Sequence, residues 1–209
     1  MLQTANLSFQ YKKKEPTFHF PDISLKKQEN LLILGKSGVG KTTFLHLLAG
    51  LLKPISGTVA INDTLINSLS PSRLDKFRGQ NIGLVFQKNH VVKSLNVFDN
   101  LQARLFFSRK SINKATIDHL LEQLDLYEVK KNNVNQLSEG QLQRLGIANA
   151  VIHNPQIILA DEPTSSLDDD NCKIVIDLLI NQAKQTNANL IVITHDHRVK
   201  SSFPNSISL

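Results

Sequence analysis

The stretch 35–42 reads Gly35-Lys36-Ser37-Gly38-Val39-Gly40-Lys41-Thr42 and matches G-x-x-x-x-G-K-[ST], the pattern of a glycine-rich loop that wraps around phosphate groups. Its glycines accept positive φ at little cost, so the backbone can curl and point several N–H groups at one anion. Lys41 would bring a positive charge to the outer phosphates, and the hydroxyl of Thr42 could hold Mg²⁺. The alternative is a glycine-rich turn without a ligand, but chance rarely produces so specific a pattern.

The two segments that flank this loop support the phosphate-binding interpretation. Residues 31–34 form a short apolar run that predicts a buried strand, and residues 43–48 begin a helical pattern. A helix N-terminus favours negative charge, because its first N–H groups have no partner within the helix. The sequence therefore predicts a strand, a phosphate loop and a helix in succession.

Apolar runs alternate with helical patterns along much of the remaining chain. We expect strands near residues 58–61, 82–86, 157–160 and 190–193, and helices over 138–153 and 171–186. Such alternation predicts an α/β fold in which a mostly parallel sheet is covered by helices on both faces, as in the P-loop NTPases. Residues 1–30 read as short strands around a lysine-rich turn, which predicts a small N-terminal antiparallel part. We expect one domain over residues 1–209.

Residues 89–136 contain no strand candidate and are predicted to form a helical subdomain inserted in the core. Apolar residues recur at four-residue spacing at Val97, Leu101 and Leu105. The same spacing separates Ile117 from Leu121 and Leu120 from Leu124. The aromatic pair Phe106-Phe107 is expected to belong to the core rather than to a binding surface.

Bulk properties limit the possible functions without choosing among them. The chain has 209 residues, a net charge of +6 and a single cysteine, Cys172. A basic balance suits phosphate ligands, an anionic membrane surface or nucleic acid. The run Lys12-Lys13-Lys14 is explained by a solvated loop or by attraction to anionic lipid head groups. One cysteine excludes an internal disulfide and a cysteine-based zinc site, and we expect it to pack inside a helix.

No apolar run approaches the roughly 18 residues that cross a bilayer, and the first residues lack the pattern of a signal peptide. Little sequence follows His195, so no regulatory tail is expected. We therefore expect a protein that is soluble, or peripheral at a membrane through a partner.

Acidic and polar residues follow the predicted strands at the edge where phosphates should bind. Asp161 and Glu162 come directly after residues 157–160, and the carboxyl ends of such strands carry the chemistry of open α/β sheets. Asp161 would hold Mg²⁺, and Glu162 would act as a general base on the attacking water. His195 follows the strand at 190–193 and could hydrogen-bond the γ-phosphate. Gln87 could touch Mg²⁺ or the water, or could merely begin a loop.

Ser138 and Gln141 predict the start of a helix. A serine followed three residues later by glutamine is a capping box, which by itself explains both residues. The N–H groups exposed at such a helix start can also bind an anion, so the functional interpretation coexists with the structural one.

Taken together, these motifs resemble those of the ATP-binding-cassette (ABC) ATPases, in that family's order and at its spacings over nearly the whole chain. The branch with the most similar general appearance comprises lipoprotein-releasing, macrolide-export and cell-division ATPases. The resemblance implies an adenine-stacking role for Tyr11 and extends the phosphate loop to Thr43. It also implies ATP contacts from the signature 137–141 and the loop 166–168, through these residues: Ser138, Gly140, Gln141 and Asp168.

The resemblance further implies an ATPase that uses ATP and Mg²⁺ and works as a head-to-tail homodimer. The signature helix of one copy would close on the γ-phosphate held by the loop of the other. A separate integral membrane permease would rest on a groove near Gln87, with residues 88–101 as candidate contacts. The chain would then lie at the cytoplasmic face of the inner or plasma membrane.

Two residues depart from the family pattern. Glu139 stands where the signature usually has glycine, and Asn149 stands where an arginine is common. A carboxylate near the γ-phosphate would slow closure of the dimer, unless it turned to solvent or met a lysine. We therefore expect slow intrinsic ATP turnover.

Other functions compete with a transporter ATPase. A cell-division-type ATPase would signal through a membrane partner without moving solute. A nucleic-acid ATPase of the repair or chromosome-maintenance type would carry a long coiled coil before the signature, and no sustained heptads occur here, so no nucleic acid is expected as partner. A small-molecule kinase would leave the Ser138 helix and His195 without a role.

Overall fold

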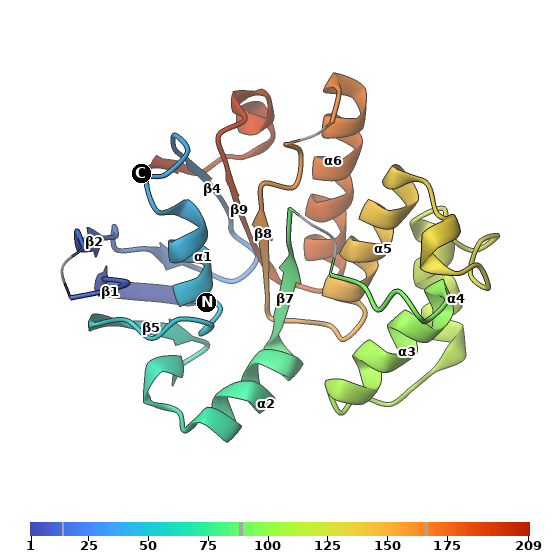
Figure 1. Cartoon of the computed structure of the whole chain (residues 1–209), viewed down its shortest axis with the longest axis horizontal. Coiled ribbons are helices and arrows are strands. Elements are labelled where there is room, and N and C mark those ends of the chain that lie inside the picture. The colour runs from blue at the N-terminus through green and yellow to red at the C-terminus, as the bar shows by residue number, and fades with distance from the viewer. Residues whose placement is uncertain (14, 88–89, 166) are drawn as a thin grey trace.

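The computed structural model describes residues 1–13, 15–87, 90–165 and 167–209. Four residues of the segments named above, Lys14, Lys88, Asn89 and Ser166, lie outside the described residues. The chain folds into two sheets with helices packed around the larger one (Figure 1).

The larger sheet is wholly parallel over its described strands. Its order is β10 (Ser206–Ser208), β4 (Asn30–Leu34), β9 (Asn189–Thr194), β8 (Ile157–Asp161) and β7 (Ile82–Val85). The buried strands β8 and β9 read as continuous apolar runs because helices cover both faces. The predicted parallel sheet is therefore confirmed, and all its strands end at one edge.

The smaller sheet is antiparallel and forms the N-terminal part, as the sequence predicts. β1 (Leu2–Phe9) pairs with β2 (Phe18–His19), with β3 (Ser24–Leu25) and with β5 (Ser56–Ile61), and β5 pairs with β6 (Thr64–Leu65). Gly57 makes this pairing possible. It has a φ of 86°, and a Cβ there would lie 2.4 Å from the carbonyl oxygens of Ala5 and Asn6.

The helices connect and cover the strands. They are α1 (Lys41–Leu48), α2 (Pro71–Asn81), α3 (Val97–Phe107), α4 (Lys114–Gln123), α5 (Glu139–Val151) and α6 (Asp169–Gln185), with short 3₁₀ turns at Ile66–Ser68, Val134–Gln136 and His197–Ser202. In Figure 1, α1 and the small sheet lie on one side of the large sheet, and α3 to α6 lie on the other.

Two apolar clusters form the core, one on each face of the parallel sheet. Leu31, Ile33 and Leu159 face α1 and the antiparallel sheet, whereas Leu32 and Ile158 face α3 to α6. Cys172 is buried in the second cluster, as expected. The apolar residues of α3 and α4 share that cluster with the sheet, so 90–136 packs on the core. Its status as a separate subdomain stays a prediction.

One packing expectation is wrong. Phe106 and Phe107 at the end of α3 are 67% and 75% exposed. The buried stripe of the helix ends with Leu105, and the two aromatic rings contact each other in a T-shaped pair. In the described residues, no helix is long and apolar enough to cross a bilayer.

Candidate nucleotide site

The phosphate loop joins β4 to α1 and curls as its glycines predict. Gly38 and Gly40 have φ of 86° and 100°. A Cβ on Gly40 would lie 2.8 Å from the ring of Phe18, so both the backbone conformation and the close approach of β2 require glycine there. The side chain of Lys41 folds back over the loop, and its Nζ donates to the carbonyl oxygens of Gly35 (2.8 Å) and Lys36 (3.0 Å).

Lys41 also connects this loop to the end of β8. Its Nζ lies 3.3 Å from Oε1 of Glu162, and both side chains are largely buried. The fold therefore brings together two motifs that are more than a hundred residues apart in the chain.

Asp161, the last residue of β8, carries a buried carboxylate whose Oδ1 has no hydrogen-bond partner among the described residues. Burial raises the pKa of Asp161, the hydroxyl of Thr42 partly offsets that rise, and the nearby charge of Glu162 adds to it. An unpartnered carboxylate oxygen beside a threonine hydroxyl is the donor set that a small, hard cation prefers. The residues present therefore fit the expected Mg²⁺.

Glu162 is held by three donors from β9 and the residue after it. Oγ1 of Thr194 donates to Oε2 at 2.7 Å, the backbone N–H of His195 donates at 3.3 Å, and Nδ1 of His195 lies 2.9 Å from Oε2. Burial acts to raise the pKa of Glu162, but the hydrogen bonds from His195 and Thr194 outweigh it and hold the pKa below its ordinary value. The carboxylate is thus ionised at neutral pH and able to accept a proton.

Two other predicted residues lie near this cluster. The hydroxyl of Tyr11 is 2.8 Å from Oγ1 of Thr43, so the tyrosine reaches the helix that follows the phosphate loop. Nε2 of Gln87 donates to Oγ of Ser165 at 3.2 Å, which connects the end of β7 to the loop after Glu162. Adenine stacking by Tyr11 and a contact of Gln87 with Mg²⁺ or water stay predictions.

Ser138 and Asp168 begin the two helices that carry the remaining predicted residues. The capping box is confirmed, since Oγ of Ser138 accepts from the N–H of Gln141 and Oε1 of Gln141 accepts from the N–H of Ser138. Asp168 caps α6 by accepting from Asn171, and these bonds lower the pKa of Asp168. A cavity of about 260 Å³ has Glu139, Gly140 and Asp168 in its wall.

The signature helix and the phosphate loop do not meet within one chain. Among the described residues, no hydrogen bond or ion pair joins the signature 137–141 to the loop 35–43. In Figure 1, α1 and α5 lie on opposite sides of the parallel sheet. The structure therefore forms two separate clusters from the predicted residues.

Sequence reasoning missed the part played by Thr194 and the contact between Lys41 and Glu162. Thr194 is fully buried at the end of β9, and a polar residue that closes an apolar strand at this edge is a signal that could have identified it. Asp196 binds Thr164 and Arg198 and so fixes the chain after His195.

Comparison with known proteins gives the class of this protein. Residues 19–165 match the ABC transporter family. The chain is 36% identical over 209 residues to a protein named lipoprotein-releasing system ATP-binding protein LolD from Buchnera aphidicola, covering 98% of this chain and 92% of that one. It is 35% identical to YvcR of Bacillus subtilis, an uncharacterised ABC transporter ATP-binding protein, covering 94% and 78%.

Solved structures that resemble this chain belong to the same class of protein. The dimeric, post-hydrolysis state of the ATP-binding cassette MJ0796 bound to ADP and Pi superposes with a TM-score of 0.88, at 32% identity, over 100% of this chain and 94% of that one. CbiO1 of Clostridium perfringens gives 0.87, at 26% identity, over 99% and 83%.

The chain therefore belongs to the ABC transporter ATPases. It is an ATP-hydrolysing subunit that works with a membrane partner, and its relatives place it in the LolD-like branch.

Proposed function

We propose that the cluster around Lys41, Asp161 and Glu162 binds Mg²⁺ and ATP and hydrolyses the terminal phosphoanhydride bond. The observation that carries this assignment is the contact of 3.3 Å between Lys41 of the phosphate loop and Glu162 at the end of β8. It brings a phosphate-binding cation and an ionised carboxylate to one point. Bound Mg²⁺ would neutralise charge on the phosphates, and Thr42 and Asp161 would hold it, with Gln87 as a further candidate.

The nucleotide would displace contacts that this chain now makes internally. Lys41 would exchange the carbonyls of Gly35 and Lys36 for phosphate oxygens, and the N–H groups of residues 35–43 would surround the phosphates. Glu162 would accept a proton from the water that attacks the γ-phosphate, while Thr194 and His195 hold its carboxylate in place. A positioned general base contributes about 10²–10⁴ in rate.

The second cluster completes the site from another copy of the chain. The capped start of α5 exposes the N–H groups of Glu139 and Gly140, which could bind a phosphate. The phosphate loop of the same chain, as far as the structure describes it, does not reach them. A two-fold arrangement would place the signature of each copy, with Ser138, Gly140, Gln141 and Asp168, against the nucleotide held by its mate. The dimeric assembly named for MJ0796 supports this arrangement.

The membrane partner is a separate integral permease that docks between α2, β7 and α3, near Gln87. His90, Val92 and Asn100, from the described part of 88–101, line this groove. The chain would then work at the cytoplasmic face of the inner or plasma membrane. A cell-division-type role, in which the ATPase signals without moving solute, is the second candidate.

The experiment is Glu162→Gln, with Glu122→Gln on the exposed face of α4 as the matched control. We expect Glu162→Gln to bind ATP as the parent does and to lose turnover by about 10²-fold or more, whereas the control keeps both. ATP binding is measured by calorimetry and turnover by phosphate release. Parental turnover in Glu162→Gln would remove Glu162 as the base.

A further inference from the structure

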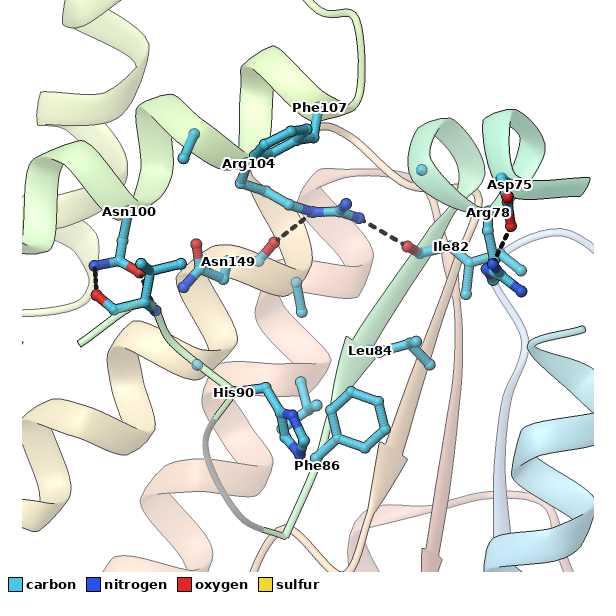
Figure 2. A pocket seen from close by; sticks show the side chains of 16 residues that line it. Asp75, Arg78, Ile82, Leu84, Phe86, His90, Asn100, Arg104, Phe107 and Asn149 are labelled. Atoms are coloured by element: carbon cyan, nitrogen blue, oxygen red, sulfur yellow. Dashed lines mark hydrogen bonds and ion pairs between the residues drawn. The ribbon is translucent and has the colours of Figure 1, made fainter. Parts of the chain in front are cut away.

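A cavity of about 460 Å³ opens between α2, β7, α3 and α5, away from the phosphate loop. Figure 2 shows its lining. β7 is the last strand of the parallel sheet, so the cavity runs along a free sheet edge. Most of the wall is apolar, and these residues supply it: Ile82, Leu84, Val85, Phe86, Val92 and Phe107.

One cation, Arg104 of α3, extends across this wall. Its Nε donates to the carbonyl of Asn149 at 3.2 Å, and its Nη2 donates to the carbonyl of Ile82 at 3.1 Å (Figure 2). Nη2 also lies 2.8 Å from Nε2 of His153. Nε2 of His153 also lies 3.2 Å from the carbonyl oxygen of Ile82, so the imidazole and the guanidinium both contact that oxygen. Nη1 donates to none of the described residues.

Among the described residues, Arg104 therefore has neutral partners and no counter-ion. Burial, followed by the charge of Arg104, lowers the pKa of His153 to about 3, so the imidazole is neutral. Burial also lowers the pKa of Arg104, and no carboxylate offsets this effect. No ion pair found among the described residues includes Arg104, and the four undescribed residues, two lysines, an asparagine and a serine, carry no acid.

The other charged residues of the cavity wall do not supply a counter-ion for Arg104. Asp75 is the one acid that lines the cavity in the described chain, and it is bonded to Arg78, whose Nη1 donates to the carbonyl of Gly50. A largely buried guanidinium without a carboxylate is unfavourable, because buried charges are normally paired. The cavity thus offers an apolar surface with one uncompensated positive charge.

The rim of the cavity exposes apolar side chains to solvent. Phe107 is 75% exposed and Val92 is half exposed, so large apolar side chains stand at the entrance. Phe106, next to Phe107 on α3, is 67% exposed and its ring contacts that of Phe107. Apolar groups that surround one desolvated charge are the arrangement of an interface anchor.

We propose that the cavity binds a segment of the membrane subunit whose apolar side chains surround one aspartate or glutamate, and that this carboxylate pairs with Arg104. The proposal rests on the proposed docking of a permease, and it adds the chemistry of the docking segment. A carboxylate can accept from Nη1 while the existing bonds to Ile82 and Asn149 keep the guanidinium in place.

The first test measures binding of the purified chain to native membrane vesicles stripped of peripheral proteins with urea. Arg104→Gln is compared with Arg109→Gln, an exposed arginine just beyond α3 and outside the cavity. We expect Arg104→Gln to weaken binding by about thirtyfold or more, since it removes one partner of a buried charge pair. Arg109→Gln should bind as the parent does. Arg109→Gln should keep the ATP turnover and melting temperature of the isolated chain, and cooperative thermal unfolding of Arg104→Gln shows that this variant folds.

The second test identifies the carboxylate. Arg104→Lys places a primary amine in the cavity, and a carbodiimide joins an amine to a carboxylate in direct contact. We expect a cross-link from position 104 to an aspartate or glutamate in a cytoplasmic segment of an integral membrane protein, mapped by mass spectrometry. Arg109→Lys should give no such cross-link.

Three results would overturn the proposal. Arg104→Gln could bind the vesicles as tightly as the parent, both arginine variants could weaken binding equally, as attraction to anionic lipid would require, or Arg104→Lys could form no cross-link to a carboxylate. If the parent chain itself fails to bind the vesicles, the proposed membrane docking fails together with this inference.

Discussion

Glu162 has a backbone conformation that non-glycine residues rarely adopt. Its φ is 49°, in the left-handed region, and its N–H donates to the carbonyl of Ile193 on the neighbouring strand at 2.8 Å. This turn directs the carboxylate toward Thr194, His195 and Lys41. Strain of this kind costs on the order of 1–3 kcal/mol and persists where the surroundings fix it, often at functional sites.

The first residue-scale prediction concerns pH. Glu162 must be ionised to accept a proton, so activity is present above its pKa and is lost as pH falls through it. His195→Ala removes the hydrogen bond from the imidazole, which lowers this pKa, whereas the bonds from Thr194 and from the backbone N–H of residue 195 remain and burial still raises the pKa. We expect the acid limb of the kcat/KM profile of the residual activity to shift to higher pH. His197→Ala, an exposed neighbour, is the control and should leave the limb unchanged. An unshifted limb in His195→Ala would exclude His195 as the residue that tunes Glu162.

The second prediction concerns Glu139, which is exposed in the first turn of α5 and forms no ion pair with a described residue. In the proposed dimer its carboxylate approaches the γ-phosphate of the other copy. We expect Glu139→Gly and Glu139→Gln to raise the rate of ATP turnover, because both remove the charge. Glu128→Gln, at an exposed position away from the signature, should change nothing. Turnover that stays at the parental rate in both Glu139 variants would remove the repulsion argument.

Some residues of the site could be predicted from the sequence, and the contacts of others could not. The phosphate loop, Asp161, Glu162 and the Ser138 cap follow from local patterns, because their roles depend on neighbours in the chain. The contacts of Glu162 with Lys41 and His195 depend on the packing of β4, β8 and β9, which no local pattern encodes. Likewise, the exposure of Phe106 and Phe107 depends on where the stripe of α3 leaves the core.

At the scale of elements, the contact between β7 and α5 positions the signature. A Cβ on Gly83 in β7 would lie 2.2 Å from the carbonyl oxygen of Ala150 in α5. Gly83→Ala must therefore push backbone against backbone. We expect a loss of stability of about 1–3 kcal/mol, at the upper end of that range, measured by urea unfolding.

Gly79 in α2 gives the matched control. A Cβ there would meet the carbonyl oxygen of Phe107 at 3.6 Å, which is an ordinary contact, and its φ is not positive. Gly79→Ala should be neutral or stabilise the chain by about 0.4–1 kcal/mol through the unfolded state. Equal effects of the two substitutions on stability would contradict the close contact of β7 with α5.

Elements with a buried face were predicted and elements without one were missed. α2 has no fully buried residue among Pro71–Asn81, and only Leu74 and Phe77 pack partly buried against the core, so its apolar periodicity is weak and Pro71 at its start was the clearer signal. β10 is three residues long and reads Ser-Ile-Ser. The apolar runs of β4, β7, β8 and β9 gave the parallel sheet, because both faces of these strands are covered.

At the scale of the whole molecule, we propose that one chain carries half of each of two sites rather than one complete site. The phosphate loop, Asp161 and Glu162 lie in one cluster, and the signature lies across the parallel sheet (Figure 1). In this proposal two copies of the chain enclose each ATP between these surfaces, so that ATP binding holds the copies together and hydrolysis releases them.

The most direct measurement is the mass in solution of Glu162→Gln with Mg²⁺ and ATP, by light scattering after gel filtration. We predict that the mass rises from 23.4 kDa to about twice that value with ATP but not with ADP. Glu162→Gln that also carries Lys41→Ala should stay at the single-chain mass. A Glu162→Gln chain that binds ATP and yet remains at 23.4 kDa would contradict the account.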